Sequence, residues 1–350
     1  MKNFAVDEAI TRLESRARLS ADEWCAVLCA FDADGRELLA RRAREVALHQ
    51  FGSGVYVRAL IEISSYCRNN CFYCGLRRGN SLAARYRLGK DDILACCNRA
   101  AAAGFNTFVL QGGEDPVQSD AWLADVVSAI KERYPEKAVT LSVGERSAKG
   151  YAMLRAAGAD RYLLRHETAD AAHYARLHPQ GMSLENRKRC LYMLKELGYQ
   201  VGSGMMIGSP GQTIQHLAQD LMLLDELQPQ MIGIGPFIPA GGTPFKGEPQ
   251  GSAGDTLLLV SLLRLRFPRA LIPATTALAT LLPDGTEQGV LAGANVVMPN
   301  VTPPSERGKY TIYDNKKITG SEAVEQIAAL DERLAKIGYH VDFSRGDYKT

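Results

Sequence analysis

The sequence predicts an α/β protein, a (β/α)8 TIM-type barrel with helices before it and a short extension after it. Short apolar, β-branched runs recur after residue 54, and each ends in polar or glycine-rich residues. Most gaps between the runs have helical spacing, and the units together span about 250 residues, as in such barrels. An open doubly wound sheet is the alternative, but no glycine-rich dinucleotide fingerprint follows the first run.

Three parts follow one another along the chain. Residues 1–54 are expected to form helices, with Ser20 capping one of them and Gly52 ending the helical pattern. Residues 55–305 are expected to form the barrel. Residues 306–350 are expected to form a C-terminal extension that closes it, with a helix over 321–336 and then a loose tail.

The expected strands are the apolar runs themselves, and the clearest expected helices lie between them. The strands are Val55–Ser65, Thr107–Gln111, Ala138–Val143, Arg161–Arg165, Val201–Ile207, Met231–Phe237, Leu271–Thr276 and Asn295–Pro299. The helices are Lys90–Ala103, Ala121–Tyr134, Leu184–Leu197, Thr213–Leu227 and Asp255–Phe267.

Composition excludes several classes of protein. Lys and Arg number 41 against 39 Asp and Glu, a net charge of +2, which argues against a large nucleic-acid surface. No run approaches the roughly 20 apolar residues of a membrane span, and the first residues do not resemble a secretory signal, so we expect a cytoplasmic protein. Eight cysteines are too few for a disulfide scaffold and point instead to metal binding or catalysis.

Three of these cysteines follow the first strand with C-x3-C-x2-C spacing: Cys67, Cys71 and Cys74. In a barrel the active site lies at the C-terminal ends of the strands, so this loop belongs there. A structural zinc site would want a fourth Cys or His nearby, whereas three thiolates leave one iron of an iron–sulfur cube open. Structural zinc and unligated core cysteines remain alternatives. Cys25 and Cys29 share one helix face and are expected to be buried, with metal binding as the alternative. Cys96, Cys97 and Cys190 lie in helical segments and are expected to be core or incidental residues.

With the aromatic Tyr73 before its last cysteine, the motif resembles that of the radical S-adenosylmethionine (SAM) superfamily. The resemblance implies one 4Fe-4S cluster on the three cysteines, with SAM chelated at the open iron and Tyr73 contacting that cofactor. It also implies that one electron from the cluster cleaves SAM to methionine and a 5′-deoxyadenosyl radical.

Other strand ends carry polar residues with weaker signals. Gly112 and Gly113 let the backbone approach a ligand, although an ordinary turn is the alternative. Glu167 ends the fourth strand, and Arg187 in the next helix is able to pair with it or with a ligand carboxylate. His166 is the only histidine at a strand end and is equally consistent with a packing role; the other histidines are expected to be surface or packing residues.

Several stretches together resemble the FeFe-hydrogenase maturase HydE family over residues 55 to 305. The most diagnostic are CGLRRGN after the cysteines and YLLRHET on the fourth strand; biotin synthase and methylornithine synthase differ at these points. The resemblance implies assembly of the hydrogenase di-iron site from a small cysteine-bound iron carbonyl–cyanide complex. It also implies an electron donor such as ferredoxin or flavodoxin, and other hydrogenase maturases as partners.

The same resemblance assigns residues to two sites. The SAM contacts are Tyr73, Gln111, Gly112, Gly113, Glu167 and Arg187. The substrate cavity and its anion sites are lined by Thr140, Arg165, Met231, Thr275, Thr276 and Tyr310.

One departure from the family pattern concerns a second cluster. Some members bind one through cysteines after the eighth strand, but residues 305–350 contain no cysteine, so we expect a single cluster. Two other functions remain open: a related radical SAM enzyme acting on an amino-acid-like or thioether substrate, and a non-catalytic iron–sulfur electron carrier. Carriers usually have full cysteine ligation, which this loop lacks.

Overall fold

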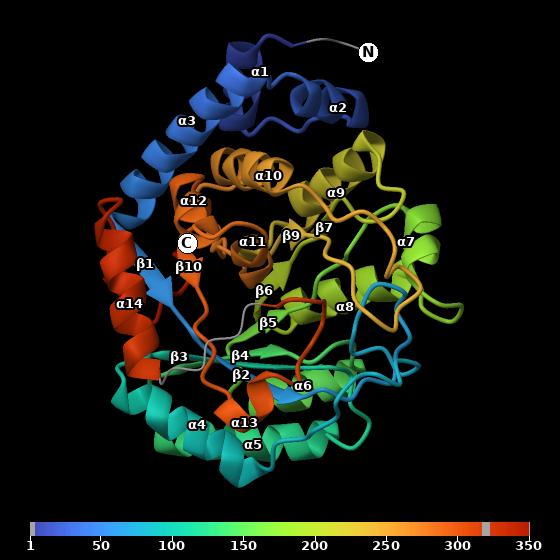
Figure 1. Cartoon of the computed structure of the whole chain (residues 1–350), viewed down its shortest axis with the longest axis vertical. Coiled ribbons are helices and arrows are strands. Elements are labelled where there is room, and N and C mark those ends of the chain that lie inside the picture. Colours follow the sequence, from blue (N-terminus) through green and yellow to red (C-terminus); the bar gives the residue numbers. More distant parts are fainter. Residues whose placement is uncertain (1–3, 317–322, 350) are drawn as a thin grey trace.

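The computed structural model describes residues 4–316 and 323–349 of the chain. Helices α1 (Val6–Ser15), α2 (Ala21–Cys29) and α3 (Ala33–Phe51) gather at one end of the molecule, the top of Figure 1. Ser20 caps α2 as predicted: its hydroxyl accepts from the Glu23 N–H, and the Glu23 carboxylate accepts from the Ser20 N–H. The expected helical N-terminal segment is confirmed.

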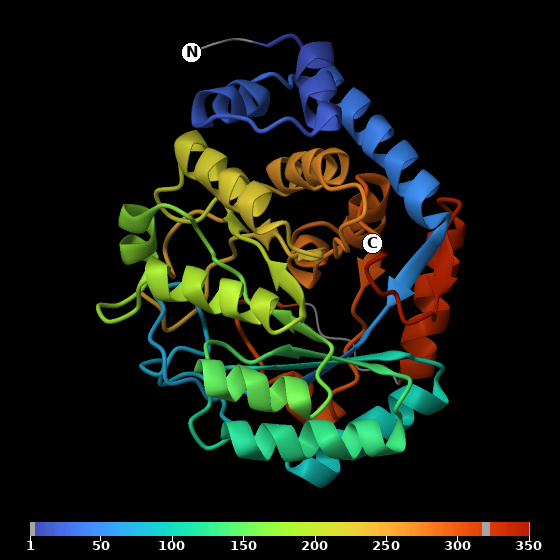
Figure 2. The same cartoon turned by 180° about the vertical axis from the view of Figure 1, so that it is seen from behind.

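Six strands form one parallel sheet, in the order β2-β3-β4-β5-β6-β8. They are β2 (Ala59–Ser64), β3 (Thr107–Gly112), β4 (Ala138–Ser142), β5 (Arg161–Leu163), β6 (Gln200–Ser203) and β8 (Met231–Ile232). Parallel pairing requires crossover connections, and the intervening segments supply them as helices that cover the sheet from outside (Figures 1 and 2). The α/β class and the parallel sheet are therefore confirmed.

The covering helices are α4 (Lys90–Ala102), α5 (Asp120–Arg133), α6 (Ala148–Ala156), α7 (Ala171–Leu177), α8 (Leu184–Glu196), α9 (Ile214–Leu227), α10 (Ala253–Arg266), α11 (Thr276–Leu281), α12 (Gly285–Leu291) and α13 (Pro304–Arg307). Five of them, α4, α5, α8, α9 and α10, match the predicted segments to within one or two residues, and the others were not predicted. None of the described helices is both long enough and apolar enough to cross a membrane.

Backbone pairing continues beyond the six-stranded sheet through isolated bridges. They join Met231 to Leu271, Pro273 to Val296, and Asn300 back to Leu60 in β2. The predicted strand Leu271–Thr276 is wrong in extent, because Pro273 has no N–H to donate and helix α11 already begins at Thr276. Two further strands, β7 (Met206–Ile207) and β9 (Gly235–Pro236), pair with each other.

The C-terminal residues are not the loose tail that we predicted. Strand β11 (His340–Asp342) pairs with β1 (Gly54–Val57), which also pairs with β10 (Val296–Val297). Past β11, the carboxylate of Asp347 accepts from buried Arg161 at 2.6 Å. An otherwise uncompensated buried guanidinium thus anchors the tail at the N-terminal ends of the strands. The predicted closing helix is α14 (Ala323–Ala335); residues 321 and 322 lie outside the described residues.

Candidate active site at the C-terminal ends of the strands

Residues 65–88, which we call the cysteine loop, connect β2 to α4 and carry Cys67, Cys71 and Cys74. Side chains hold its shape together with backbone bonds such as those from Phe72 to Leu177 and from Gly75 to Ile312. The Arg85 guanidinium donates to the carbonyls of Ser65 (2.5 Å), Leu76 (2.9 Å) and Arg77 (2.8 Å). Asn80 donates to the Gly75 carbonyl at 2.8 Å. Because these bonds satisfy backbone groups that no strand or helix pairs, the loop is fixed where the cysteines lie.

The three thiols are free and partly buried. Burial, and then its two cysteine neighbours, raise the pKa of Cys71 well above the ordinary value. Burial and Cys67 raise the pKa of Cys74 to about 12. Thiols in such surroundings become thiolates only when a metal supplies compensating charge.

The donor set fits a cluster better than one metal ion. Among the described residues, no group of three or more His, Cys, Asp or Glu side chains has the placement that a single ion requires. In a 4Fe-4S cube each thiolate binds a different iron, so the sulfurs surround the cluster rather than one point. Three neighbouring thiols match a cube with one open iron.

The end of β3 packs directly against the cysteine loop. A Cβ atom on Gly113 would lie 2.2 Å from the Tyr66 carbonyl oxygen and 2.7 Å from the Cys67 Cβ, so no other residue fits there. Gln111, at the same strand end, donates to the Tyr310 hydroxyl at 3.4 Å. The predicted SAM-binding segment therefore borders the cysteines, and the close approach explains its glycine.

The predicted acid and base of the SAM site have partners that differ from our expectation. Arg165 donates to Glu167 at 2.6 Å, whereas Arg187 donates to Glu145 at 2.6 Å and to the Arg165 carbonyl at 2.5 Å. Of the two partners that we considered for Arg187, Glu167 is therefore bound by Arg165 instead, and a ligand carboxylate stays a prediction. Glu167 has a φ of 66°, a left-handed conformation that costs a residue with a side chain about 1–3 kcal/mol. Such strain is typical of functional sites.

Glu145 is a residue that sequence reasoning did not single out. Its carboxylate accepts from Arg187 and, at 2.5 Å, from the Asn186 amide, so it orients the arginine that we assigned to SAM. Its position directly after β4 was the available signal.

Tyr73 is held by a histidine that we expected only to pack. Its hydroxyl lies 3.2 Å from Nε2 of His178, whose Nδ1 lies 3.0 Å from the Tyr174 carbonyl. Burial lowers the pKa of His178 to about 4, so the ring is neutral at pH 7. Since a carbonyl only accepts, Nδ1 carries the hydrogen and Nε2 accepts from Tyr73.

Electrostatic effects show that several predicted residues share one place. Burial, then Glu167 and Cys71, raise the pKa of Tyr73 well above its usual range, while Arg187 opposes them. The pKa of Tyr310 is likewise raised, first by burial and also by Cys74. Tyr73, Glu167, Arg187 and Tyr310 thus lie close enough to one another or to the cysteines to interact electrostatically.

Three of the predicted cavity residues carry buried polar atoms that lack a partner among the described residues. They are Oγ1 of Thr140, Nε of Arg165 and Oγ1 of Thr275. Thr275 stands at the N-cap of α11 without making a side-chain cap bond, and Thr276 beside it is half-buried. Because most buried polar groups are hydrogen-bonded, these atoms are suited to a polar or anionic ligand.

Met231 lies apart from those threonines. It begins β8 and packs with Tyr56, Leu271 and Val296, and its sulfur accepts from Arg58 at 3.3 Å. It therefore contributes to the N-terminal end of the sheet interior rather than to the polar group around Thr275.

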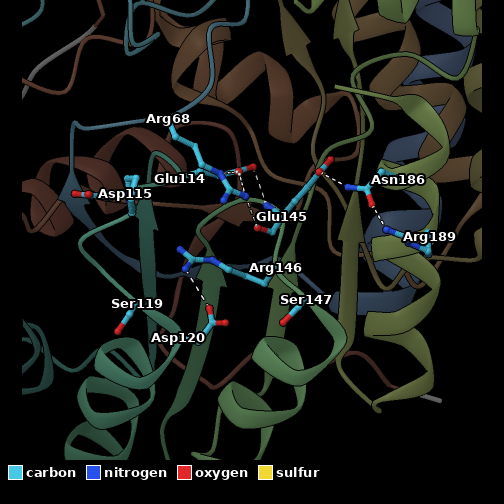
Figure 3. A pocket seen from close by; sticks show the side chains of 11 residues that line it. Arg68, Glu114, Asp115, Ser119, Asp120, Glu145, Arg146, Ser147, Asn186 and Arg189 are labelled. Carbon is cyan, nitrogen blue, oxygen red and sulfur yellow. Dashed lines mark hydrogen bonds and ion pairs between the residues drawn. The ribbon is translucent and has the colours of Figure 1, made fainter. Parts of the chain in front are cut away.

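A cleft of about 560 Å³ opens beside the site (Figure 3). Its lining is strongly charged, and none of the predicted site residues belongs to it. The lining residues are Arg68, Glu114, Asp115, Pro116, Ser119, Asp120, Glu145, Arg146, Ser147, Asn186 and Arg189. Two of them reach the site: Glu114 follows Gly113 and pairs with Arg68, and Glu145 orients Arg187. The cleft is thus a neighbour of the candidate site, with which it shares a wall.

Comparison with known proteins agrees with this geometry. A profile of the Radical SAM superfamily matches residues 61–224, which include the cysteine loop. The chain is 44% identical over 309 residues to the [FeFe] hydrogenase maturase subunit HydE of Thermotoga maritima, covering 88% of each sequence. It is 31% identical over 299 residues to the 3-methylornithine synthase of Methanosarcina barkeri, covering 85% of this chain and 84% of that one.

Two solved structures share the fold. Methylornithine synthase (PylB) superposes with a TM-score of 0.82 at 28% identity, covering 95% of this chain and 97% of that one. The maturase HydG from Carboxydothermus hydrogenoformans superposes with a TM-score of 0.79 at 21% identity, covering 97% and 79%.

Proposed function

The chain belongs to the radical SAM superfamily and is a homologue of the maturase HydE, and from that premise we propose that it helps to assemble the di-iron site of an [FeFe] hydrogenase. The proposed substrate is a small cysteine-bound iron carbonyl–cyanide complex. The observation that carries the proposal is 44% identity over 88% of the chain. Partly buried cysteines beside unpartnered cavity atoms support it.

The cofactors implied by the superfamily are a 4Fe-4S cluster and SAM, and the residues present fit both. Cys67, Cys71 and Cys74 would hold the cluster. When bound, the pair supplies one-electron cleavage of SAM to methionine and a 5′-deoxyadenosyl radical. We propose a single cluster, and iron analysis after reconstitution should give about four irons per chain rather than about eight.

The chain's own residues would position SAM. The backbone of Gln111, Gly112 and Gly113 would receive the methionyl ammonium beside Cys67. Glu167, held by Arg165, and Arg187, held by Glu145, would orient the remaining polar groups. Tyr73, fixed by His178, would lie against SAM on the cluster side. Prior fixation of these side chains lowers the cost of ordering them when SAM binds.

The substrate would lie deeper in the sheet interior. Thr140, Arg165 and Thr275 have the unpartnered donors that anionic ligands such as cyanide would meet. Thr276 and Tyr310 would complete the lining. A cavity inside the sheet keeps a radical away from water and from other thiols.

We also propose that residues 55–305 form one complete (β/α)8 barrel, with residues 1–54 and 306–350 as its N-terminal and C-terminal covers. The bridges from β8 through Leu271, Pro273 and Asn300 back to β2 support a closed ring. We expect a cytoplasmic enzyme that receives electrons from a ferredoxin or flavodoxin and works with other hydrogenase maturases.

The test is an anaerobic assay. The reconstituted, reduced protein is given SAM with a synthetic iron–cysteine carbonyl complex, and matched reactions contain free cysteine or no addition. Adenosylation of the complex at sulfur, with 5′-deoxyadenosine formed, is the expected result. If SAM is cleaved but the complex is ignored, the proposed substrate is wrong. An amino-acid substrate would then become the leading candidate, as the 31% identity to 3-methylornithine synthase suggests.

A further inference from the structure

The charge of the chain is unevenly distributed around the cysteine loop. Residues 63–90 contain no Asp or Glu, yet they hold Arg68, Arg77, Arg78, Arg85, Arg87 and Lys90. The whole chain is almost balanced, with 41 basic and 39 acidic residues. The segment that carries the proposed cluster is therefore a concentrated source of positive charge.

Half of these cations are compensated by carboxylates. Arg68 pairs with Glu114, Arg87 with Asp115 and Lys90 with Asp125. The other three have no carboxylate partner in the part of the chain that the structure describes. Arg77 and Arg85 donate only to backbone carbonyls, and the Arg78 side chain is exposed. Three uncompensated guanidiniums thus lie on one loop.

Exposed apolar side chains border the same charges. Leu82, on the cysteine loop, is 77% exposed, and Val117, on the loop after β3, is 66% exposed. The Arg87–Asp115 pair ties the two loops together, and Asp115 also accepts from the Val117 N–H at 3.0 Å. Among the described residues, the other large exposed hydrophobic is Leu48, at 37%, on α3. Apolar side chains amid charged neighbours are typical of a protein–protein interface.

We propose that Arg77, Arg78, Leu82, Arg85 and Val117, which we call the loop face, form the docking surface for an acidic one-electron carrier protein of the ferredoxin or flavodoxin type. The inference rests on the proposed function, which consumes an electron at the cluster. In the step itself the carrier loses one electron and the cluster gains it, and no bond forms or breaks.

Two features of the loop face favour this kind of partner. Its uncompensated charge is positive and therefore complementary to an acidic protein. It is also formed by the loop that holds the cysteines: Arg77 donates to the Cys71 carbonyl at 3.2 Å, and Arg85 donates to the Leu76 carbonyl, two residues after Cys74, at 2.9 Å. A carrier bound here would thus be next to the cluster.

The test compares substitutions on the loop face with matched ones on α3. Arg78→Glu and Leu82→Ser remove a charge and an apolar contact from the loop face. Arg41→Glu and Leu48→Ser make the same changes on α3, at the far upper left of Figure 1. The measurement is the anaerobic stopped-flow rate of cluster reduction by a reduced bacterial ferredoxin or flavodoxin. A small neutral photoreductant, 5-deazaflavin, serves as the reference that needs no docking.

Arg78→Glu should slow reduction by the carrier about tenfold at low salt. The difference should shrink near 0.15 M salt, where the Debye length is about 8 Å. Leu82→Ser should slow it about threefold with little dependence on salt. Both α3 variants should match the wild type, as should every variant with deazaflavin.

If Arg78→Glu and Leu82→Ser affect carrier reduction no more than the α3 variants, the loop face is not the docking surface. The same conclusion follows if they slow deazaflavin equally, because the effect is then on the cluster itself. Failure of the proposed function would look different: deazaflavin-reduced wild-type protein would not cleave SAM.

Discussion

Arg161 and Arg165 stand at opposite ends of one strand, and their surroundings differ. Arg161 begins β5, is fully buried, and donates to Gln200, Thr107, the Arg345 carbonyl and Asp347. Arg165 follows the end of β5; its side chain is 28% exposed, and its Nε has no partner among the described residues. The guanidinium of Arg161 thus donates its hydrogen bonds to groups of the chain, whereas that of Arg165 keeps a donor for a ligand. The contrast agrees with the general division of such folds into a stabilising end and a catalytic end.

The largest expected effect is at the catalytic end. Cys71→Ala should abolish cluster binding and all SAM cleavage, because two thiolates do not hold the cube. Iron content, the visible spectrum and 5′-deoxyadenosine measure this. Cys29 on α2 is exposed rather than buried as we predicted, and Cys29→Ala should leave all three unchanged. An unchanged cleavage rate in Cys71→Ala would refute the cluster assignment.

A substitution at the stabilising end, where β5 begins, should affect folding instead. Arg161→Met removes the buried donor that Asp347 and the Arg345 carbonyl share, although Asp347 keeps Arg345 and Gln200, and it should lower the free energy of unfolding by about 2 kcal/mol. Thermal unfolding of the apoprotein measures the change. Folded variant protein should still take up about four irons per chain. If the variant is as stable as the wild type but cannot bind the cluster, the two ends of β5 do not differ in the way described.

The double variant Thr275→Val, Thr276→Val gives a second test of the catalytic end. Oγ1 of Thr275 has no partner, so its loss should change the free energy of unfolding by less than about 1 kcal/mol. SAM cleavage should persist, while affinity for the iron complex should fall about tenfold, the value of one lost hydrogen bond. Binding titration and 5′-deoxyadenosine assays separate the two effects. Loss of the cluster in this variant would contradict the role that we propose.

The smallest expected effect is a pH dependence at the stabilising end. Burial alone would raise the pKa of Asp347, but Arg161 and Arg345 outweigh it, so the pKa lies below its ordinary value. A depressed carboxyl pKa stabilises the fold above the unfolded-state value, about 3.9, and this contribution is lost as pH falls through the folded-state value. The stability difference between wild type and Asp347→Asn should be constant from pH 7 to about 5 and shrink below about 4. A difference that grows on acidification would show that another group is responsible.

Local sequence signals predicted much of the fold, and they are also the basis of the site assignments, which stay predictions. The apolar runs of β2, β3 and β4 and the Ser20 capping box depend on neighbours in sequence, and each is where we expected it. The prediction of the site depended on the spacing of the cysteines and on the glycine at position 113, because few other residues meet the requirements of these positions.

Features that depend on distant partners were not predictable. The pairing of β11 with β1, and of Asp347 with Arg161, joins residues far apart in sequence, so the tail looked unattached. Arg187 pairs with Glu145 rather than with Glu167 because the loop after β4 brings Glu145 next to it. No local sequence pattern indicates this contact. The role of His178 depends on the Tyr174 carbonyl, which fixes its tautomer.

The contacts of Arg85 also bear on how the enzyme survives damage to its cluster. Its guanidinium binds main-chain carbonyls, and none of those bonds involves sulfur or iron. These bonds therefore help to order the cysteine loop on folding without requiring a ligand on its thiols. If oxygen destroyed the cluster, the loop would keep the shape that binds it. Repair would then require a new cluster but no refolding of the loop.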